Sequence, residues 1–408
     1  MTKSIFKSIL KVLIFSVPIL GAHSALAGDT TVQSELGYET FYRASDEMFS
    51  MNRPYLIQKL EMPVPNTTNP WLPEAFEGEY RAWGNFSFPQ SNSGEKGAFD
   101  LRTLKLRWSG ESWKLSVGLQ DIVWGETFGD RVVDVVNPRD YSDYVLTDLS
   151  WAILPVWAVS AQKLFDPFSL QLVYVPLTVH DKLPVQVAGV PIIDNSPDPR
   201  AFRDNEYGAR AGVLLPEGTD LKAYYYHHFN RIPVVEALIL PSQQMAFAVN
   251  APQMIETYGL SATHALGSFV LRADIAYNEN EFITAVDYGT PFHGNPLHGV
   301  LGTDWTADDQ TTLGWQLHYD SDPRDASPLF WGSVQCHLQL LDGKLVPEAL
   351  IYKGLNNRDL WANPGLTAHV GAHWLLHAQG DYILGRQGSL LQLYQQENRV
   401  LGRVSYLF

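Results

Sequence analysis

The chain ends in the sequence RVLGRVSYLF (residues 399–408), and these ten residues decide the fold. The side chains of a β-strand point alternately to its two faces. One face carries Val400, Gly402, Val404, Tyr406 and Phe408, and the other carries Arg399, Leu401, Arg403, Ser405 and Leu407. An apolar face that ends on an aromatic residue, opposite a face with two arginines, is hard to explain in a water-soluble fold. It is typical of a strand with one face in lipid and the other in a water-filled lumen.

The terminal aromatic residues resemble the C-terminal signal by which bacterial outer-membrane barrels are recognised for insertion. Phe408 is the last residue, and Tyr406 lies two positions before it. The glycine that is usual in this signal would fall at Arg403, whereas here a glycine lies at position 402. The resemblance implies two kinds of partner. One is the barrel-assembly machinery, through the strand that ends at Phe408, and the other is the lipid and lipopolysaccharide of the outer membrane.

Residues 1–27 have the pattern of a secretory signal peptide. Lys3, Lys7 and Lys11 precede a short apolar run, and Ala25-Leu26-Ala27 fits the small-residue cleavage rule. No later stretch is apolar over the roughly 18 consecutive residues that a membrane-spanning helix needs. We therefore predict a signal peptide at 1–27 and a single domain at 28–408, which we expect to be an outer-membrane barrel.

The composition supports a membrane barrel and excludes other classes. Aromatic residues make up 12% of the chain and charged residues only 18%, which suits aromatic girdles at two membrane interfaces and a surface that faces lipid. The formal net charge of −15 argues against nucleic acid as a partner, because nucleic-acid binding requires a basic face. Cys336 is the only cysteine, so the chain cannot form an internal disulfide bond.

Six further segments alternate between apolar and polar residues with period two, and turn residues separate them. They are residues 104–108, 113–120, 269–277, 312–319, 333–340 and 366–374. Asp342-Gly343 is a strong signal for a hairpin turn. A soluble β-sandwich also alternates, but its exposed face would be rich in Lys, Glu and Thr. We predict an all-β, antiparallel transmembrane barrel of about 16 strands (range about 14–18), which is what 381 mature residues allow.

Residues 121–148 break the alternation and form a candidate constriction. Glu126, Arg131, Asp134, Arg139 and Asp140 place five charges in a short stretch. The order Asn-Pro at 137–138 predicts a helix start, so we expect a short helix at 138–147. Charges so close together favour mutual ion pairs, which would let the segment fold into the barrel and narrow its lumen.

The same segment resembles a known family. VWGE (residues 123–126) followed by DVVNPRD (residues 134–140) is similar to the motif W-G-E/T, then D-x-x-N-P-x-D, of a large uncharacterised group of proteobacterial porin-like proteins of the outer membrane. Residues 117–120, 271–277 and 302–305 resemble weaker motifs of that group. The resemblance implies an outer-membrane β-barrel with no agreed substrate. A more distant similarity to alginate-exporting barrels leaves polymer export open.

The motifs of common enzymes and cofactor sites are absent from the sequence. It contains no G-x-S-x-G, H-E-x-x-H, Walker A or dinucleotide fingerprint, so we predict neither an enzyme nor a cofactor. His318, His337, His369 and His373 could form an inward cluster that binds a transition metal or responds to pH. The alternative is that they are half-polar lumen residues. The acidic loop at 194–206 lacks the D-x-D-x-D-G spacing of a calcium loop, and we predict no metal site.

Three functions remain open at this stage. The first is a channel for small polar solutes, lined by charged residues. These are Arg102, Lys105, Arg107, Lys114, Glu126, Arg131, Asp134, Arg139, Asp140, Arg272, Asp274 and Arg403. The second is a barrel plugged by residues 121–148 and 180–206 that serves an export or uptake complex for a polymer, a lipid or a hydrophobic compound. The third is a hydrolase at the barrel rim.

Overall fold

The structure, a computed structural model, describes most of the chain outside the first 29 residues. The described residues are 30–44, 48–64, 72–84, 97–128, 132–141, 152–183, 186–187, 190–194, 196, 198–231, 234–284, 289–308, 310–321, 328–385, 391 and 398–408. The predicted signal peptide at 1–27 lies outside these residues and stays a prediction.

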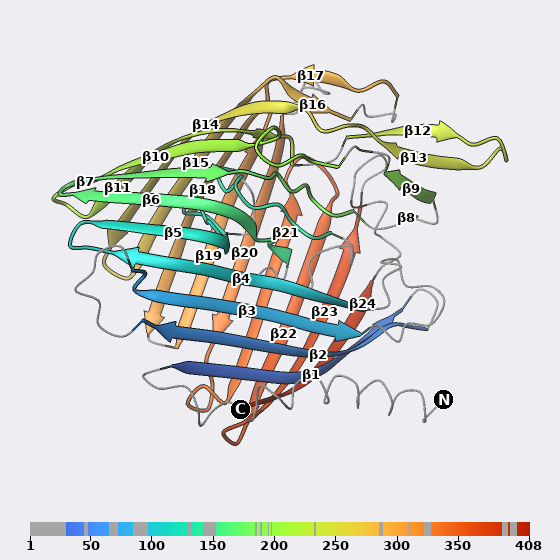
Figure 1. The fold of residues 1–408 in the computed structure, drawn as a ribbon. Helices are drawn as coiled ribbons and strands as arrows, with labels where there is room; N and C mark the ends of the chain where they lie inside the picture. Colours follow the sequence, from blue (N-terminus) through green and yellow to red (C-terminus); the bar gives the residue numbers. More distant parts are fainter. Residues whose placement is uncertain are drawn as a thin grey trace.

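A single closed sheet dominates the described residues (Figure 1). Its eighteen strands each pair antiparallel with the next barrel strand along the chain, and the last strand pairs with the first. No barrel strand is therefore left as an edge, which suits a sheet that must satisfy its backbone inside a bilayer. The predicted antiparallel barrel is confirmed. Eighteen strands lie at the upper end of the predicted range and exceed the best estimate of about 16, because many turns are shorter than that estimate assumed.

The barrel strands follow one another round the wall in chain order. The first nine are β1 (Thr31–Arg43), β2 (Met48–Pro63), β3 (Ala75–Gly84), β4 (Gly97–Ser109), β5 (Trp113–Gln120), β6 (Val156–Phe165), β7 (Phe168–Val175), β10 (Glu206–Leu214) and β11 (Thr219–Phe229). The other nine are β14 (Met254–Leu266), β15 (Phe269–Glu279), β18 (Leu297–Asp308), β19 (Thr311–Asp320), β20 (Leu329–Leu338), β21 (Leu345–Gly354), β22 (Leu360–Val370), β23 (Trp374–Leu384) and β24 (Arg399–Leu407).

Most connections at one end of the barrel are short turns, and most at the other end are longer; the connections of β2 to β1 (residues 44–47) and to β3 (residues 64–74) are exceptions. Only two residues separate β6 from β7 and β14 from β15, and the predicted turn at Asp342-Gly343 has positive φ at both residues. The long connections include residues 121–155 and 230–253. They hold two small sheets, made of β8 (Gln186–Val187), β9 (Val190–Asp194), β12 (Val235–Ile239) and β13 (Met245–Val249), and of β16 (Glu281–Ile283) and β17 (Phe292–Gly294).

The two faces of the wall differ as the sequence predicts. On β24, Val400 is 54% exposed, whereas Leu401 on the other face is 2% exposed. On β15, Leu271 and Ile275 are exposed outward, and Asp274 on the inner face is 4% exposed. An apolar outer surface next to a polar interior is the arrangement of a strand between lipid and a lumen.

The predicted helix at 138–147 is wrong where the structure describes it. Arg139 forms an antiparallel bridge with Ile153, and Asp140 forms a parallel bridge with Lys182. The Asn137 side chain does not cap a helix, because its Oδ1 accepts a hydrogen bond from the distant Ile122 N at 2.7 Å. Residues 142–147 lie outside the described residues. No helix in the described ranges has the length and apolar character to cross a membrane.

A buried ion cluster fastens the seam where the barrel closes. The β1–β24 pairing runs from Glu35–Leu407 to Arg43–Arg399. At its middle, Glu39 is fully buried and its carboxylate contacts Arg53 on β2 and Arg403 on β24, the latter at 3.2 Å. One acid thus joins three consecutive strands across the seam, so Arg403 is a structural residue here.

Replacing Glu39 by alanine is expected to weaken the closed barrel. The change removes the carboxylate that both guanidinium groups contact, and breaking a buried ion pair from one side typically costs about 3–5 kcal/mol. Urea unfolding of the barrel in detergent micelles, followed by tryptophan fluorescence, measures the loss. The matched control is Glu61→Ala, which changes a rim acid that is 54% exposed and should cost less than about 1 kcal/mol. Equal losses in the two variants would contradict a special role for the seam cluster.

Candidate functional site

Beyond β5 the chain leaves the wall and folds against the inner face of the barrel. We call the described part of this connection, residues 121–128 and 132–141, the inner segment. It contains both halves of the motif noted in the sequence, Trp124-Gly125-Glu126 and Asp134 to Asp140. The geometry of these residues explains most of that motif.

Trp124 is the apolar centre of the inner segment. Its ring is 1% exposed and packs on Tyr224 and Tyr226 of β11 at centroid distances of 5.5 and 5.4 Å. The indole Nε1 donates a hydrogen bond to Gln171 of β7 at 3.1 Å. The buried cluster around it consists of Ile122, Trp124, Val132, Val133, Val135, Val136, Val156, Ala158, Val173, Val175, Tyr224, Tyr226, Ala276 and Val300. One side of the lumen therefore holds a hydrophobic core that fixes the segment to the wall.

Asp274 on β15 anchors the tip of the segment at Glu126 and Thr127. Its carboxylate accepts hydrogen bonds from the backbone N–H groups of Glu126 and Thr127, both at 3.0 Å, and from the hydroxyls of Thr127 (2.6 Å) and Ser261 (2.5 Å). Gly125 makes the approach possible: its φ is +93°, and a Cβ there would lie 3.1 Å from the carboxylate. A buried carboxylate satisfied by so many donors holds the backbone of the segment firmly.

A chain of alternating charges continues from this anchor along the wall. Glu126 contacts Lys222 of β11 and accepts a hydrogen bond from the Thr263 hydroxyl at 3.1 Å. On its other side lies Arg272, with Nη1 3.8 Å from the Glu126 carboxylate and Nε 2.7 Å from the Asp304 carboxylate. Asp220 also lies 2.9 Å from Lys222. With Asp274 the cluster has four carboxylates and two cations, so the wall here is strongly polar with a small excess of negative charge.

Asp134 and Asn137 tie together the two limbs of the inner segment. Asp134 Oδ1 accepts a hydrogen bond from Trp124 N at 3.0 Å. Asn137 accepts from Ile122 N and donates to the carbonyl of Leu154 at 2.8 Å. The Asp and Asn of the second half of the motif therefore fix the backbone of the first half.

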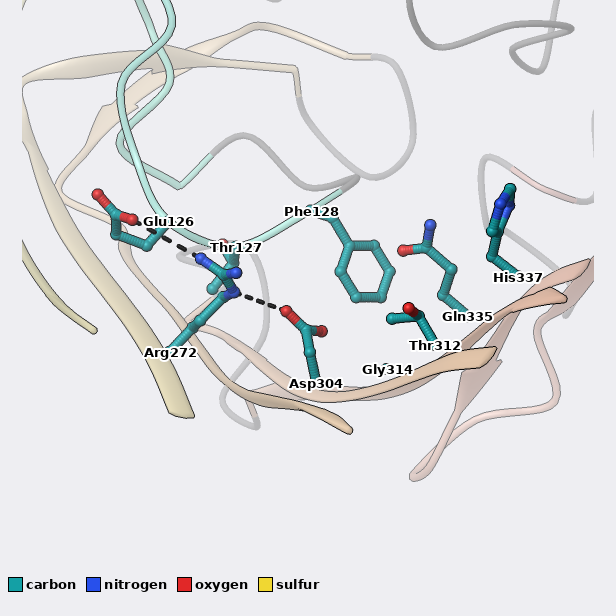
Figure 2. A pocket seen from close by; sticks show the side chains of 9 residues that line it. All are labelled: Glu126, Thr127, Phe128, Arg272, Asp304, Thr312, Gly314, Gln335 and His337. Atoms are coloured by element: carbon teal, nitrogen blue, oxygen red, sulfur yellow. Dashed lines mark hydrogen bonds and ion pairs between the residues drawn. The ribbon is translucent and has the colours of Figure 1, made fainter. Parts of the chain in front are cut away.

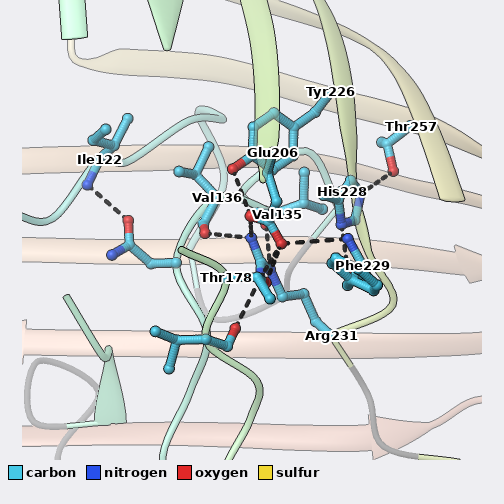
Figure 3. A network of polar contacts seen from close by, with 12 residues as sticks. Ile122, Val135, Val136, Thr178, Glu206, Tyr226, His228, Phe229, Arg231 and Thr257 are labelled. Atoms are coloured by element: carbon cyan, nitrogen blue, oxygen red, sulfur yellow. Dashed lines mark hydrogen bonds and ion pairs between the residues drawn. The ribbon is translucent and has the colours of Figure 1, made fainter. Parts of the chain in front are cut away.

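A buried ion pair anchors the inner segment at Val135 and Val136, near the long-loop end of the barrel (Figure 3). Glu206 is fully buried, and Arg231 is 4% exposed. Two guanidinium nitrogens lie 2.9 and 2.5 Å from the Glu206 carboxylate. The same guanidinium donates to the carbonyls of Val135 at 2.9 Å and Val136 at 2.7 Å. Burial, followed by the Arg231 charge, lowers the pKa of the neighbouring His180, which favours its uncharged form beside the pair.

A pocket of about 370 Å³ lies beside the tip of the segment (Figure 2). The tip contributes Glu126, Thr127 and Phe128, and β15 and β18 contribute Arg272 and Asp304. The wall beyond contributes Thr312, Gly314, Gln335 and His337. Phe128 is held in place because the Gln316 side-chain amide, oriented to suit both partners, pairs with its backbone N and O at 2.9 and 3.0 Å.

Three of the predicted site residues meet at the tip of the inner segment, and the others lie elsewhere in the segment or on other parts of the barrel wall. Glu126, Arg272 and Asp274 lie at the tip of the inner segment. Asp134 lies within the segment, as does Arg139, whose backbone N donates to Asp181 at 2.7 Å. The Asp140 carboxylate lies 3.4 Å from Lys182. Arg131 lies outside the described residues.

The other predicted lining residues lie across the barrel. Lys105 and Arg107 of β4 contact Glu77 of β3 at 2.9 and 2.5 Å. Arg102 is 8% exposed and donates to the carbonyl of Ile153. A bulge between β3 and β4 at Glu79 explains why Arg102 and Lys105, three positions apart, share the inner face. Lys114 is exposed near the short-turn end.

Sequence reasoning missed several residues that hold the site together. Lys222, Glu206 and Arg231 have no local pattern that marks them, and Asp304 lies in the weak motif at 302–305 but was not selected as a site residue. Arg231 contacts Val135, which lies 96 residues away, and Asp274 contacts the Glu126 backbone across 148 residues. The alternation of β15 was a usable signal for Asp274, because it placed this residue on the polar face of the strand. No three His, Cys, Asp or Glu side chains converge as metal ligands in the described part of the chain.

The closed barrel with an inward-folded connection defines the class of protein: a porin-like β-barrel of the outer-membrane type. Solved structures with this fold include OccK8 (OprE) of Pseudomonas aeruginosa, with TM-score 0.53 and 10% identity over 93% of this chain and 98% of that one. OccAB4 of Acinetobacter baumannii gives TM-score 0.53 and 11% identity over 93% and 97% of the two chains. At such identities the likeness establishes the fold alone.

The family is established separately, by sequence. Residues 104–319 match the family described as "Protein of unknown function (DUF1302)". The match covers more than half of the chain, so the protein belongs to this family. A search of curated proteins found no match.

Replacing Asp274 by asparagine is expected to loosen the tip of the inner segment. The amide keeps one acceptor oxygen but loses the charge, and a hydrogen bond to a charged group contributes about 1.5–3 kcal/mol. Amide hydrogen exchange at Glu126 and Thr127 should accelerate by about 10- to 100-fold. Asp304→Asn is the matched control, because Asp304 pairs with Arg272 and contacts no backbone N–H of the segment. Unchanged exchange in the Asp274 variant would show that another contact holds the tip.

Proposed function

We propose that the protein is a channel of the bacterial outer membrane through which small polar solutes diffuse. The observation that carries this proposal is that the inner segment lies along one side of the lumen. The anchors described above come from β7, β10, β11, β14, β15 and β19. Lys105, Arg107 and Glu77 lie on β3 and β4, which are three or four strands from β7 and seven or eight strands from β15 along the wall.

The charge pattern of the two sides supports polar solutes with little net charge. Arg272 lies beside Asp304 on one side, and Lys105 lies beside Glu77 on the other. Adjacent opposite charges produce strong local fields across a narrow lumen but no large net potential. Such a lumen suits polar or zwitterionic solutes better than multiply charged ones.

A second candidate is a plugged barrel that serves an export or uptake complex. The rigid anchoring of the inner segment favours it, as does the β12–β13 hairpin that extends beyond the long-loop end (Figure 1). Leu238, Ile239 and Met245 of this hairpin are 41%, 71% and 49% exposed. Exposed apolar side chains of this size are typical of contact surfaces. A barrel that never conducts ions, but forms a stoichiometric complex with another envelope protein, would favour this candidate over the channel.

Planar-bilayer recordings test the channel directly. The wild-type barrel should conduct ions in discrete steps. Asp304→Asn should shift the selectivity toward anions, because Arg272 loses a counter-charge in the lumen. The expected change in permeability ratio is about 1.5- to 5-fold, as for a partly screened ion pair, and the reversal potential in a salt gradient measures it.

The matched control is Asp320→Asn at the long-loop end, where the carboxylate is 38% exposed and lies near His298. This change should leave the permeability ratio nearly unaltered. A folded wild-type barrel that inserts but stays silent over a wide voltage range would overturn the channel.

A further inference from the structure

The pocket beside Phe128 carries an inference about the solute, which rests on the proposed channel. We propose that this pocket is a binding subsite for a neutral, polyhydroxylated solute of the size of one sugar ring. The pocket lies between the tip of the inner segment and strands β15, β18, β19 and β20 (Figure 2).

The charged groups of the pocket are already engaged with one another. Arg272 lies between the carboxylates of Asp304 and Glu126, and Glu126 also contacts Lys222. A charged solute that entered the pocket would lose hydration without gaining a counter-charge of its own, which is unfavourable. The pocket therefore disfavours a free anion, and it offers a free cation only carboxylates that already contact Arg272 or Lys222.

The neutral polar groups of the pocket, by contrast, are available. In the described part of the chain, the side chains of Thr312, Gln335 and His337 have no hydrogen bond or ion pair with another residue. A hydroxyl and an amide each offer both a donor and an acceptor, and an imidazole offers two ring nitrogens for hydrogen bonds. A hydroxyl group of a solute is likewise both donor and acceptor, so these three side chains match a polyol better than they match an amine or a carboxylate.

Phe128 adds an apolar surface at a fixed position. A Cβ at position 314 would lie 3.0 Å from the Phe128 ring, so the glycine at this position lets the ring lie close to the wall. Figure 2 shows the ring between the ion pairs on one side and Gln335 and His337 on the other. A sugar ring has an apolar C–H face and polar edges, and it can place that face on an aromatic ring while its hydroxyls reach the polar groups around it.

The size of the pocket limits the solute. A volume of about 370 Å³ is near the lower end of the roughly 300–1,000 Å³ that is usual for small-molecule sites. It accommodates one sugar ring with its hydration. A polymer would have to extend beyond the pocket, along the lumen.

Three probes of nearly equal size separate the alternatives: glucose, gluconate and glucosamine. Titration calorimetry of the detergent-solubilised full-length barrel measures binding independently of conduction. Glucose should bind more tightly than either charged probe. Gln335→Ala should weaken glucose binding roughly threefold to tenfold, as expected for the loss of a neutral hydrogen bond, and Phe128→Ala should weaken it as well. Gln339→Ala, just beyond the end of β20, is the matched control and should bind glucose like the wild type.

Parallel bilayer recordings keep this inference distinct from the proposed channel. Glucose should reduce the current through the wild-type barrel but not through the Gln335→Ala barrel. A barrel that conducts normally but prefers gluconate or glucosamine, or binds none of the three, overturns the subsite and leaves the channel standing. A barrel that binds glucose with the expected variant pattern but never conducts overturns the channel and retains the subsite.

Discussion

Inside a bilayer no water is available to satisfy backbone N–H and C=O groups, so each strand of a membrane sheet needs a partner on both sides. The pairing of β1 with β24 meets this constraint by turning eighteen strands into a closed wall. Closure then dictates where side chains go, because alternate residues of every strand must face either lipid or the lumen. The buried Glu39, which contacts arginines on both neighbouring strands, joins the two ends of the chain at this seam. The inner face of the wall exists as a surface for other residues only because the seam is closed.

The inner segment uses that surface as its scaffold. Its hydrophobic side, centred on Trp124, covers apolar residues of β6, β7, β11, β15 and β18. Its backbone is held at two places, the tip and residues 135–136. The Asp274 carboxylate accepts hydrogen bonds from backbone N–H groups at the tip, while Arg231 donates to the backbone carbonyls of residues 135 and 136. Each anchor is itself buried: Arg231 has the carboxylate of Glu206 as its counter-charge, and the Asp274 carboxylate is stabilised by several hydrogen-bond donors. The result is a segment fixed to the wall that shapes the pocket at Phe128, and the charged groups of this pocket are paired with one another.

The sequence was sufficient for the wall because strand alternation is a local property. Val400 and Arg399, or Leu271 and Asp274, can be assigned to opposite faces from their neighbours alone. The charged motif at 124–140 was also visible, but its charges were expected to pair with one another. Instead, Glu126 contacts Lys222 and Arg272 of the wall, and Asp140 contacts Lys182. The helix was predicted wrongly because Asn137-Pro138 is a good local helix start, while the observed contacts of Asn137 with Ile122 and Leu154 are nonlocal. The anchors Glu206 and Arg231 could not be predicted, since nothing in their own neighbourhoods indicates that they meet the inner segment.

The central claim is that the inner segment lies along the wall with one side open to lumen water, and Val123 tests it most directly. Its side chain is 61% exposed, whereas Ile122 and Trp124 on either side are 5% and 1% exposed. The measurement is the bilayer current of a Val123→Cys barrel, with Cys336→Ser as background, before and after a charged, membrane-impermeant thiol reagent is added. The account predicts that the introduced thiol reacts in the folded barrel and that the current changes in a stepwise manner, while the Cys336→Ser barrel alone shows no response. A thiol that reacts only after unfolding, or a reaction that leaves the current unchanged, would contradict it.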